Sequence, residues 1–153
     1  MVRYEYPFNE SIRTMLRVEH LFDRLAQLMP REAPIDHHFA LVTLFEIMDV
    51  ASRADLKSDL LKDLERQKQQ LNAYRGNPSI SEKALDLIIE QLDQRFETLN
   101  TMVGKMGSAL SENEFLNSIR SRSAIPGGTC EFDLPAYHAW QHHTPAARQA
   151  NLY

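Results

Sequence analysis

Four cationic side chains repeat at helical spacing near the start of the chain. Arg13, Arg17, His20 and Arg24 are separated by four, three and four residues, which places them within roughly 60° of arc on one face of a helix. Guanidinium groups arranged in this way could form a groove for carboxylates. Alternatively, these side chains pair with acidic residues of neighbouring helices or face water, and the stripe alone favours this alternative. Glu10 lies near the same face and could neutralise one arginine.

Other basic residues lie far from this stripe in the sequence. Arg53, Lys57, Arg120 and Arg122 could extend it into a patch if the fold brings them together. Their separation along the chain leaves that question open.

A second group of reactive residue types lies in the segment IPGGTCEFDLPAYHAW, residues 125–140. His138 and His142 are an i, i+4 pair that could hold a metal ion, with Cys130 as a third ligand and His143 nearby. No second cysteine, HExxH sequence or paired carboxylate supports a metal, and such histidines more often pack at a helix junction. Cys130 has no marked base partner, and the glycine patterns of nucleotide-binding loops are absent. We therefore expect no enzyme and no cofactor, with a metal-dependent enzyme built on Cys130, His138 and His142 as the alternative.

The periodicity of apolar residues predicts the elements that position these side chains. Residues 2–6 alternate as in a strand and stop at Pro7, although no partner strand is evident. Residues 9–153 are expected to form one α-helical domain, so the fold class is mainly α, a bundle of about six helices with one short N-terminal strand. The expected helices are residues 9–29, 36–52, 55–75, 79 to about 104, 111–122 and 133–153.

Local signals refine this outline. Residues 36–52 are apolar nearly all round, which is typical of a helix at the centre of a bundle. Ser79 and Glu82 have the spacing of a capping box, with Ser81 as a competing cap. The Pro-Gly-Gly sequence at residues 126–128 predicts a sharp reversal between two helices.

Composition limits the class of protein. The chain has 153 residues, a formal net charge of −4 and one cysteine. Its acidic balance gives no general attraction to nucleic acid or to an anionic membrane. We see no apolar run of the roughly 20 residues that a membrane span needs, and no signal-peptide core. We expect a soluble, cytoplasmic protein.

Three stretches carry a resemblance to a known family. They are PFNESIRTMLRVEHLF (7–22), DVASRADLKSDLLKDLERQKQQL (49–71) and SIRSRSAIPGGTCEFDLPAYHAW (118–140). Together they resemble the ZapD family of bacterial Z-ring-associated proteins, in colinear order from residue 2 to about residue 150. The resemblance implies a cytoplasmic homodimer with an α-helical and a β-strand domain. It further implies binding to the C-terminal tail of FtsZ, crosslinking and bundling of FtsZ filaments, and stabilisation of the Z-ring at midcell during septum formation.

The resemblance also implies a basic contact surface, which makes the carboxylate groove the favoured interpretation of the arginine stripe. Family members continue beyond residue 153, so the chain is expected to be a C-terminally truncated product whose residues 2–6 would join a largely missing β-domain. The expected partners are FtsZ and a second copy, with no nucleic acid and no membrane. The alternative is a helical module that binds another acidic partner. The matching candidates for the FtsZ contact are Arg13, Arg17, Arg53, Arg120, Arg122 and His138.

Overall fold

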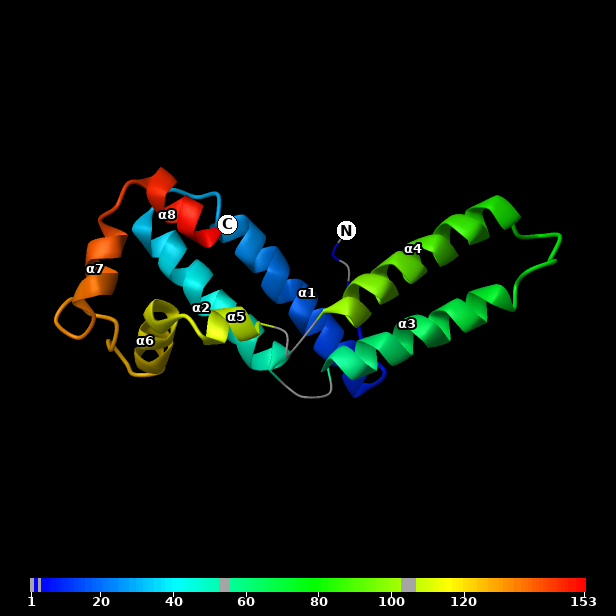
Figure 1. The fold of residues 1–153 in the computed structure, drawn as a ribbon, viewed down its shortest axis with the longest axis horizontal. Helices are drawn as coiled ribbons and strands as arrows, with labels where there is room; N and C mark the ends of the chain where they lie inside the picture. The colour runs from blue at the N-terminus through cyan, green and yellow to red at the C-terminus, as the bar shows by residue number, and fades with distance from the viewer. Residues whose placement is uncertain (1, 3, 53–55, 103–106) are drawn as a thin grey trace. The chain divides into compact units, whose positions relative to one another are not determined.

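A computed structural model describes residues 2, 4–52, 56–102 and 107–153, and every regular element within these ranges is a helix (Figure 1). The chain divides into two compact units, one of Met1–Ala51 with Gly107–Tyr153 and one of Ser52–Met106. The first unit contains α1 (Glu10–Leu28), α2 (Pro34–Ala51), α5 (Ser108–Ser111), α6 (Glu114–Ser123), α7 (Pro135–Gln141) and α8 (Pro145–Leu152). The second unit contains α3 (Leu56–Asn72) and α4 (Glu82–Thr101). None of the helices described here is long and apolar enough to cross a membrane.

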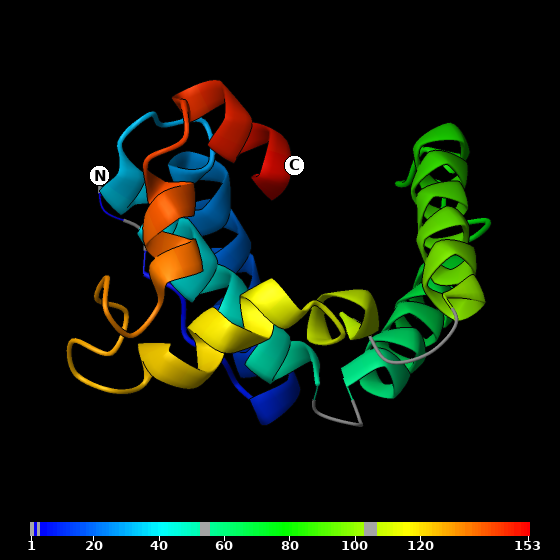
Figure 2. The ribbon, with the colours of Figure 1, turned by 60° about the vertical axis from the view of Figure 1, so that its left-hand side comes forward.

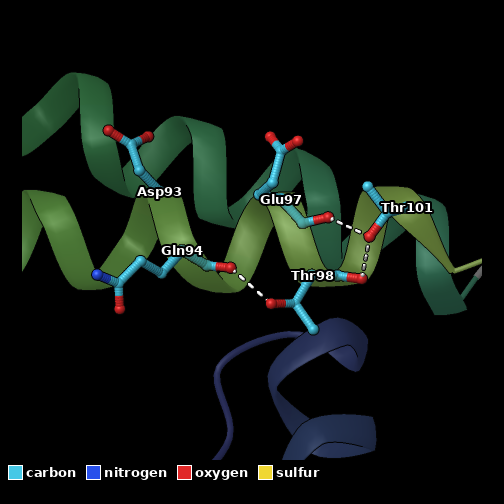
Figure 3. A pocket seen from close by; sticks show the side chains of 5 residues that line it. All are labelled: Asp93, Gln94, Glu97, Thr98 and Thr101. Atoms are coloured by element: carbon cyan, nitrogen blue, oxygen red, sulfur yellow. Dashed lines mark hydrogen bonds between the residues drawn. The ribbon is translucent and has the colours of Figure 1, made fainter.

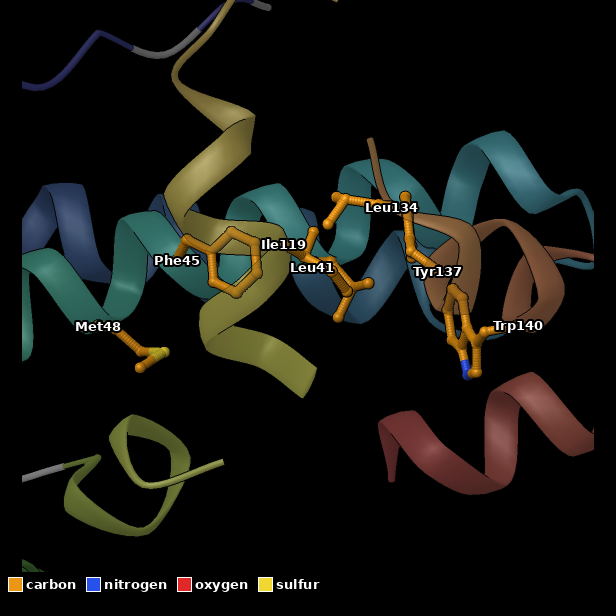
Figure 4. Packing of buried hydrophobic residues seen from close by; sticks show 7 residues of the cluster. All are labelled: Leu41, Phe45, Met48, Ile119, Leu134, Tyr137 and Trp140. Carbon is orange, nitrogen blue, oxygen red and sulfur yellow. The ribbon is translucent and has the colours of Figure 1, made fainter. Parts of the chain in front are cut away.

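Helix α2 is the centre of the first unit. Helix α1 packs along one side of it, while α6 and α7 lie on the other (Figures 1 and 2). Side chains on several faces of α2 are therefore buried, which confirms the position predicted from its apolar sequence. The core between α2, α6 and α7 consists of Leu41, Phe45, Met48, Ile119, Leu134, Tyr137 and Trp140 (Figure 4).

Helix α1 begins where the sequence predicts. The Asn9 side chain accepts a hydrogen bond from the Ile12 amide at 2.8 Å, which satisfies one free N–H of the first turn. Arg24 Nη2 donates to Glu46 Oε1 at 2.6 Å and so fixes α1 against α2. Because a short loop joins the two helices, they run antiparallel, and the N-terminal half of α1 lies beside the C-terminal end of α2.

The second unit is a hairpin of α3 and α4 with few buried side chains, namely Leu56, Leu85 and Ile89. An ion pair of 2.5 Å between Lys68 and Asp93 crosses the hairpin. Helix α4 is capped by Ser81, whose hydroxyl accepts from the Ala84 amide at 3.3 Å.

The predicted capping box of Ser79 and Glu82 is wrong. Helix α4 begins at Glu82, so Ser81 rather than Ser79 occupies the N-cap position. The Glu82 carboxylate turns back to the preceding loop, where Oε1 accepts from the Gly76 amide at 2.6 Å.

The predicted N-terminal strand is also wrong for the residues that can be described. Residues 2 and 4–6 have no strand structure, and Tyr4 and Tyr6 are 90% and 78% exposed. A strand requires a neighbouring strand to accept and donate its ladder hydrogen bonds, and the described ranges contain none. No part of the expected β-domain is therefore seen in these ranges.

The mainly helical class is confirmed, but the described residues form eight helices rather than about six. The helix expected over residues 133–153 is two helices, α7 and α8, and the separate α5 was not expected. Thr144 caps α8 by accepting from the Ala147 amide at 3.3 Å, which separates α8 from α7. The four-residue α5 precedes α6 as a separate short turn.

The Pro-Gly-Gly sequence reverses the chain between α6 and α7, as predicted. Gly127 has a φ of +70°, a value that glycine adopts without steric cost. Gly128 lies where no side chain fits, because an added Cβ would be 2.5 Å from the Arg122 carbonyl oxygen and 2.8 Å from Ile125 Cβ. The Gly128 amide donates to the Ile125 carbonyl at 2.9 Å and closes the turn.

Candidate functional site

Arg13 and Arg17 converge on a single carboxylate at the start of α1. Glu10 Oε2 lies 3.4 Å from Arg13 Nε, and Glu10 Oε1 lies 3.7 Å from Arg17 Nη1. The spacings of three and seven residues place all three side chains on one face of the helix. Each is well exposed, with 46% of the Arg13, 55% of the Arg17 and 72% of the Glu10 side chain accessible. The surface therefore holds two guanidinium groups around one carboxylate.

The rest of the predicted stripe has a different environment. Arg24 forms an ion pair with Glu46 of α2, which agrees with the alternative that these arginines pair with acidic residues of neighbouring helices. Its Nε is buried without a hydrogen-bond partner among the described residues. His20 is exposed. Arg24 thus holds two helices together, whereas Arg13 and Arg17 remain accessible to a ligand.

Arg120 and Arg122 lie in the last turn of α6, where cations interact favourably with the helix dipole. Arg120 forms an ion pair with Asp49 of α2. Arg122 is exposed, and no acidic side chain in the described ranges pairs with it. Arg53 lies outside the described residues.

His138 lies on α7 beside residues that the sequence suggested as metal ligands. Its Nε2 is 3.7 Å from Glu131 Oε2, and its ring centroid is 4.4 Å from that of His142. Cys130 instead donates its S–H to Asp133 Oδ2 at 3.4 Å. Within residues 2, 4–52, 56–102 and 107–153, no three His, Cys, Asp or Glu side chains are grouped so that they could hold a metal ion.

The first unit brings some of the predicted residues to the same end and separates others. Asp49 is near the C-terminal end of α2, so Arg120 lies at the end of the unit where α1 begins with Arg13 and Arg17. Helix α7 contacts the opposite end of α2, because the Tyr137 hydroxyl is 2.7 Å from His38 Nδ1. The eleven residues from His38 to Asp49 correspond to roughly 16 Å of helix. His138 is therefore well separated from the Arg13–Arg17 pair.

The first unit also contains a buried arginine that the sequence patterns do not indicate. Arg148 of α8 is 3% exposed, and its Nε donates to Nδ1 of the fully buried His37 at 2.9 Å. Its Nη groups donate to three main-chain carbonyl oxygens, those of Gln141, His143 and Glu32. This arginine joins α8 and the end of α7 to the start of α2. The available signal was weak, namely that His37 lies in a helix whose every face is apolar.

His38 makes a second polar contact to α7. Its ring faces the hydroxyl of Tyr137, a side chain that is almost fully buried in the core. Burial lowers the pKa of His38 because the charged imidazolium loses hydration. Burial likewise raises the pKa of Tyr137, so that its hydroxyl stays protonated.

The second unit has an open hollow along α4, lined by Asp93, Gln94, Glu97, Thr98 and Thr101 (Figure 3). Both threonine hydroxyls donate to carbonyl oxygens of their own helix, at 2.8 Å for Thr98 and 2.9 Å for Thr101. Asp93 is already paired with Lys68. Three of the five lining side chains, Asp93, Thr98 and Thr101, are thus already engaged.

Comparison with known proteins identifies close relatives. A family model described as ZapD, a cell division protein, matches residues 16–153. Proteins named cell division protein ZapD from Cupriavidus pinatubonensis, Ralstonia pickettii and Ralstonia nicotianae are 60%, 58% and 58% identical to this chain over 152 residues. Each alignment covers 99% of this chain and 60% of the relative. The chain therefore spans about 60% of the length of these curated relatives.

Proposed function

Because this chain belongs to the ZapD family of cell division proteins, we propose that it acts in division as a non-enzymatic factor that binds the C-terminal tail of FtsZ. The observation that supports this proposal is the convergence of Arg13 and Arg17 on one carboxylate at an exposed surface. Charge-assisted hydrogen bonds between guanidinium and carboxylate groups are strong and directional. The same two arginines can therefore receive an acidic side chain of a partner.

The proposed contact extends beyond this pair. Arg120 lies at the same end of the first unit. Arg122 is exposed two residues later in the last turn of α6, about half a turn around the helix from Arg120. His138, at the other end of α2, would meet a different part of an extended tail. The full proposed set, as implied by the family resemblance, is Arg13, Arg17, Arg53, Arg120, Arg122 and His138.

Bundling of filaments requires more than one tail-binding site. In this proposal, each protomer of a cytoplasmic homodimer carries one such site. The whole protein would also include the β-strand domain that the resemblance implies. Two linked sites raise the effective concentration of the second tail, so that modest affinity at each site suffices to crosslink FtsZ filaments. Such a dimer would stabilise the Z-ring at midcell.

The test is the binding of an FtsZ tail peptide to this chain and to charge-reversal variants. We expect Arg13→Glu and Arg17→Glu each to weaken binding by about tenfold or more, since a hydrogen bond to a charged group contributes about 1.5–3 kcal/mol. Arg95→Glu is the matched control, because Arg95 is exposed on α4 and forms no ion pair within the described ranges. Rising salt should weaken the wild-type interaction.

Two outcomes would contradict the proposal. One is the absence of binding by the wild-type chain, and the other is equal binding by the wild type and both α1 variants. Equally tight binding of unrelated acidic peptides would favour a general acidic-partner module instead.

A further inference from the structure

The space between Arg13 and Arg17 is already occupied by a carboxylate of the same chain. We propose that Glu10 is an intramolecular competitor, which holds this space until a carboxylate of the acidic partner displaces it. This inference rests on the proposed function and adds to it how the same site is regulated. Glu10 would make this surface selective for partners whose carboxylates bind the two arginines more tightly than the Glu10 carboxylate does.

The geometry suits displacement. Each Glu10 oxygen serves one arginine, at 3.4 Å and 3.7 Å, so the carboxylate occupies the position that a bridging ligand would take. Glu10 is the first residue of α1 after the Asn9 cap, so its backbone is fixed while its side chain is 72% exposed. Exposed ion pairs of this kind contribute little net stability because water and salt screen them. The side chain can therefore rotate away at small cost when a better-placed carboxylate arrives.

Removal of the competitor should improve binding rather than weaken it. Without Glu10, two like charges remain close together and lack their local counter-charge, which favours an incoming anion. The expected gain in binding free energy is modest, because it corresponds to the free energy of the two exposed ion pairs that the partner no longer has to displace. Binding should tighten by about three- to tenfold.

The chain offers a matched control on the same helix. Glu19 is nine residues after Glu10, which places it on roughly the opposite face of α1. It is exposed, and none of the described side chains forms an ion pair with it. Glu10→Gln and Glu19→Gln therefore make the same change in net charge and keep a good helix-forming residue. Of the two, only Glu10→Gln removes a contact with the two arginines.

The experiment measures the affinity of the FtsZ tail peptide for the wild type, Glu10→Gln, Glu19→Gln and Arg13→Glu at fixed salt, together with their thermal unfolding midpoints. We expect tighter binding for Glu10→Gln and a change of less than about twofold for Glu19→Gln. Glu10→Gln also removes a favourable charge from the first turn of α1, but lower stability would not strengthen binding.

Each outcome has one meaning. If Arg13→Glu abolishes binding while Glu10→Gln matches Glu19→Gln or binds less tightly than the wild type, the competitor role is wrong and the proposed function stands. If none of the proteins binds the tail, the proposed function and this inference both fail.

Discussion

Replacement of Arg148 tests whether the polar contact between α8 and α2 holds the first unit together. Arg148→Met keeps much of the side-chain volume and removes every donor of the guanidinium. The arginine is 3% exposed and has no carboxylate among its described partners, which are His37 Nδ1 and three main-chain carbonyl groups. The substitution loses the free energy of these hydrogen bonds but also removes the desolvation cost of a buried cation.

The hydrogen bonds dominate this balance. Loss of the donor to fully buried His37 leaves an unsatisfied acceptor, which costs about 1–3 kcal/mol. The three carbonyl contacts are only partly buried, so water replaces some of them and their loss adds less. Relief of the desolvation of the cation offsets a part of this sum. We expect a net loss of about 3 kcal/mol, a large fraction of the roughly 5–15 kcal/mol that stabilises a typical domain.

Urea unfolding followed by the fluorescence of Trp140 measures this loss. The tryptophan ring is 6.3 Å from that of His37 and so reports on the same contact. Arg148→Lys should recover only part of the stability, since an ammonium cannot reproduce the planar set of donors. Arg122→Met, at an exposed position, should change stability by less than about 0.5 kcal/mol. Equal midpoints for Arg148→Met and Arg122→Met would refute the reasoning.

Two further predictions concern the α6–α7 turn and the contact of α2 with α7. Gly128→Ala should lower the free energy of unfolding by about 3 kcal/mol, because its Cβ would meet a main-chain oxygen at 2.5 Å. Gly127→Ala should lower the free energy of unfolding by only about 1–2 kcal/mol, because the added Cβ meets no atom within 4 Å and the only cost is the φ of +70°. A larger loss for Gly127→Ala than for Gly128→Ala in urea unfolding would contradict this prediction. Burial lowers the pKa of His38 below its unfolded value of about 6.5. As the pH is lowered through that value, the unfolded chain binds a proton more readily than the folded chain, so stability decreases as the pH decreases. His38→Asn should make the decline of the thermal unfolding midpoint between about pH 7 and pH 5 shallower, and an unchanged slope would show that His38 does not contribute.

The sequence predicted the helices well where burial and capping agree. Residues 36–52 were expected at the centre because apolar side chains cover every face, and α2 lies there. The cap of α4 was predicted less well, since Ser79 and Ser81 both suit an N-cap and only the exact start of the helix selects Ser81. The strand predicted at residues 2–6 is absent from the described residues 2 and 4–6 for a different reason. Its alternation is a local pattern, whereas strand structure depends on a partner that local pattern cannot supply.

The arginine stripe shows the same limit at the candidate site. Residue type and spacing are alike for Arg13, Arg17 and Arg24, yet Arg24 is engaged by Glu46, a residue of another helix. Only the antiparallel packing of α1 and α2 creates that pair, so periodicity within α1 could not separate it from the others. The counter-charge of Arg13 and Arg17 comes instead from Glu10 on their own helix, and it is exposed. What distinguishes a cation available to a partner is therefore the location and burial of the acid that holds it. Substitution of that acid tests the site as directly as substitution of the arginines.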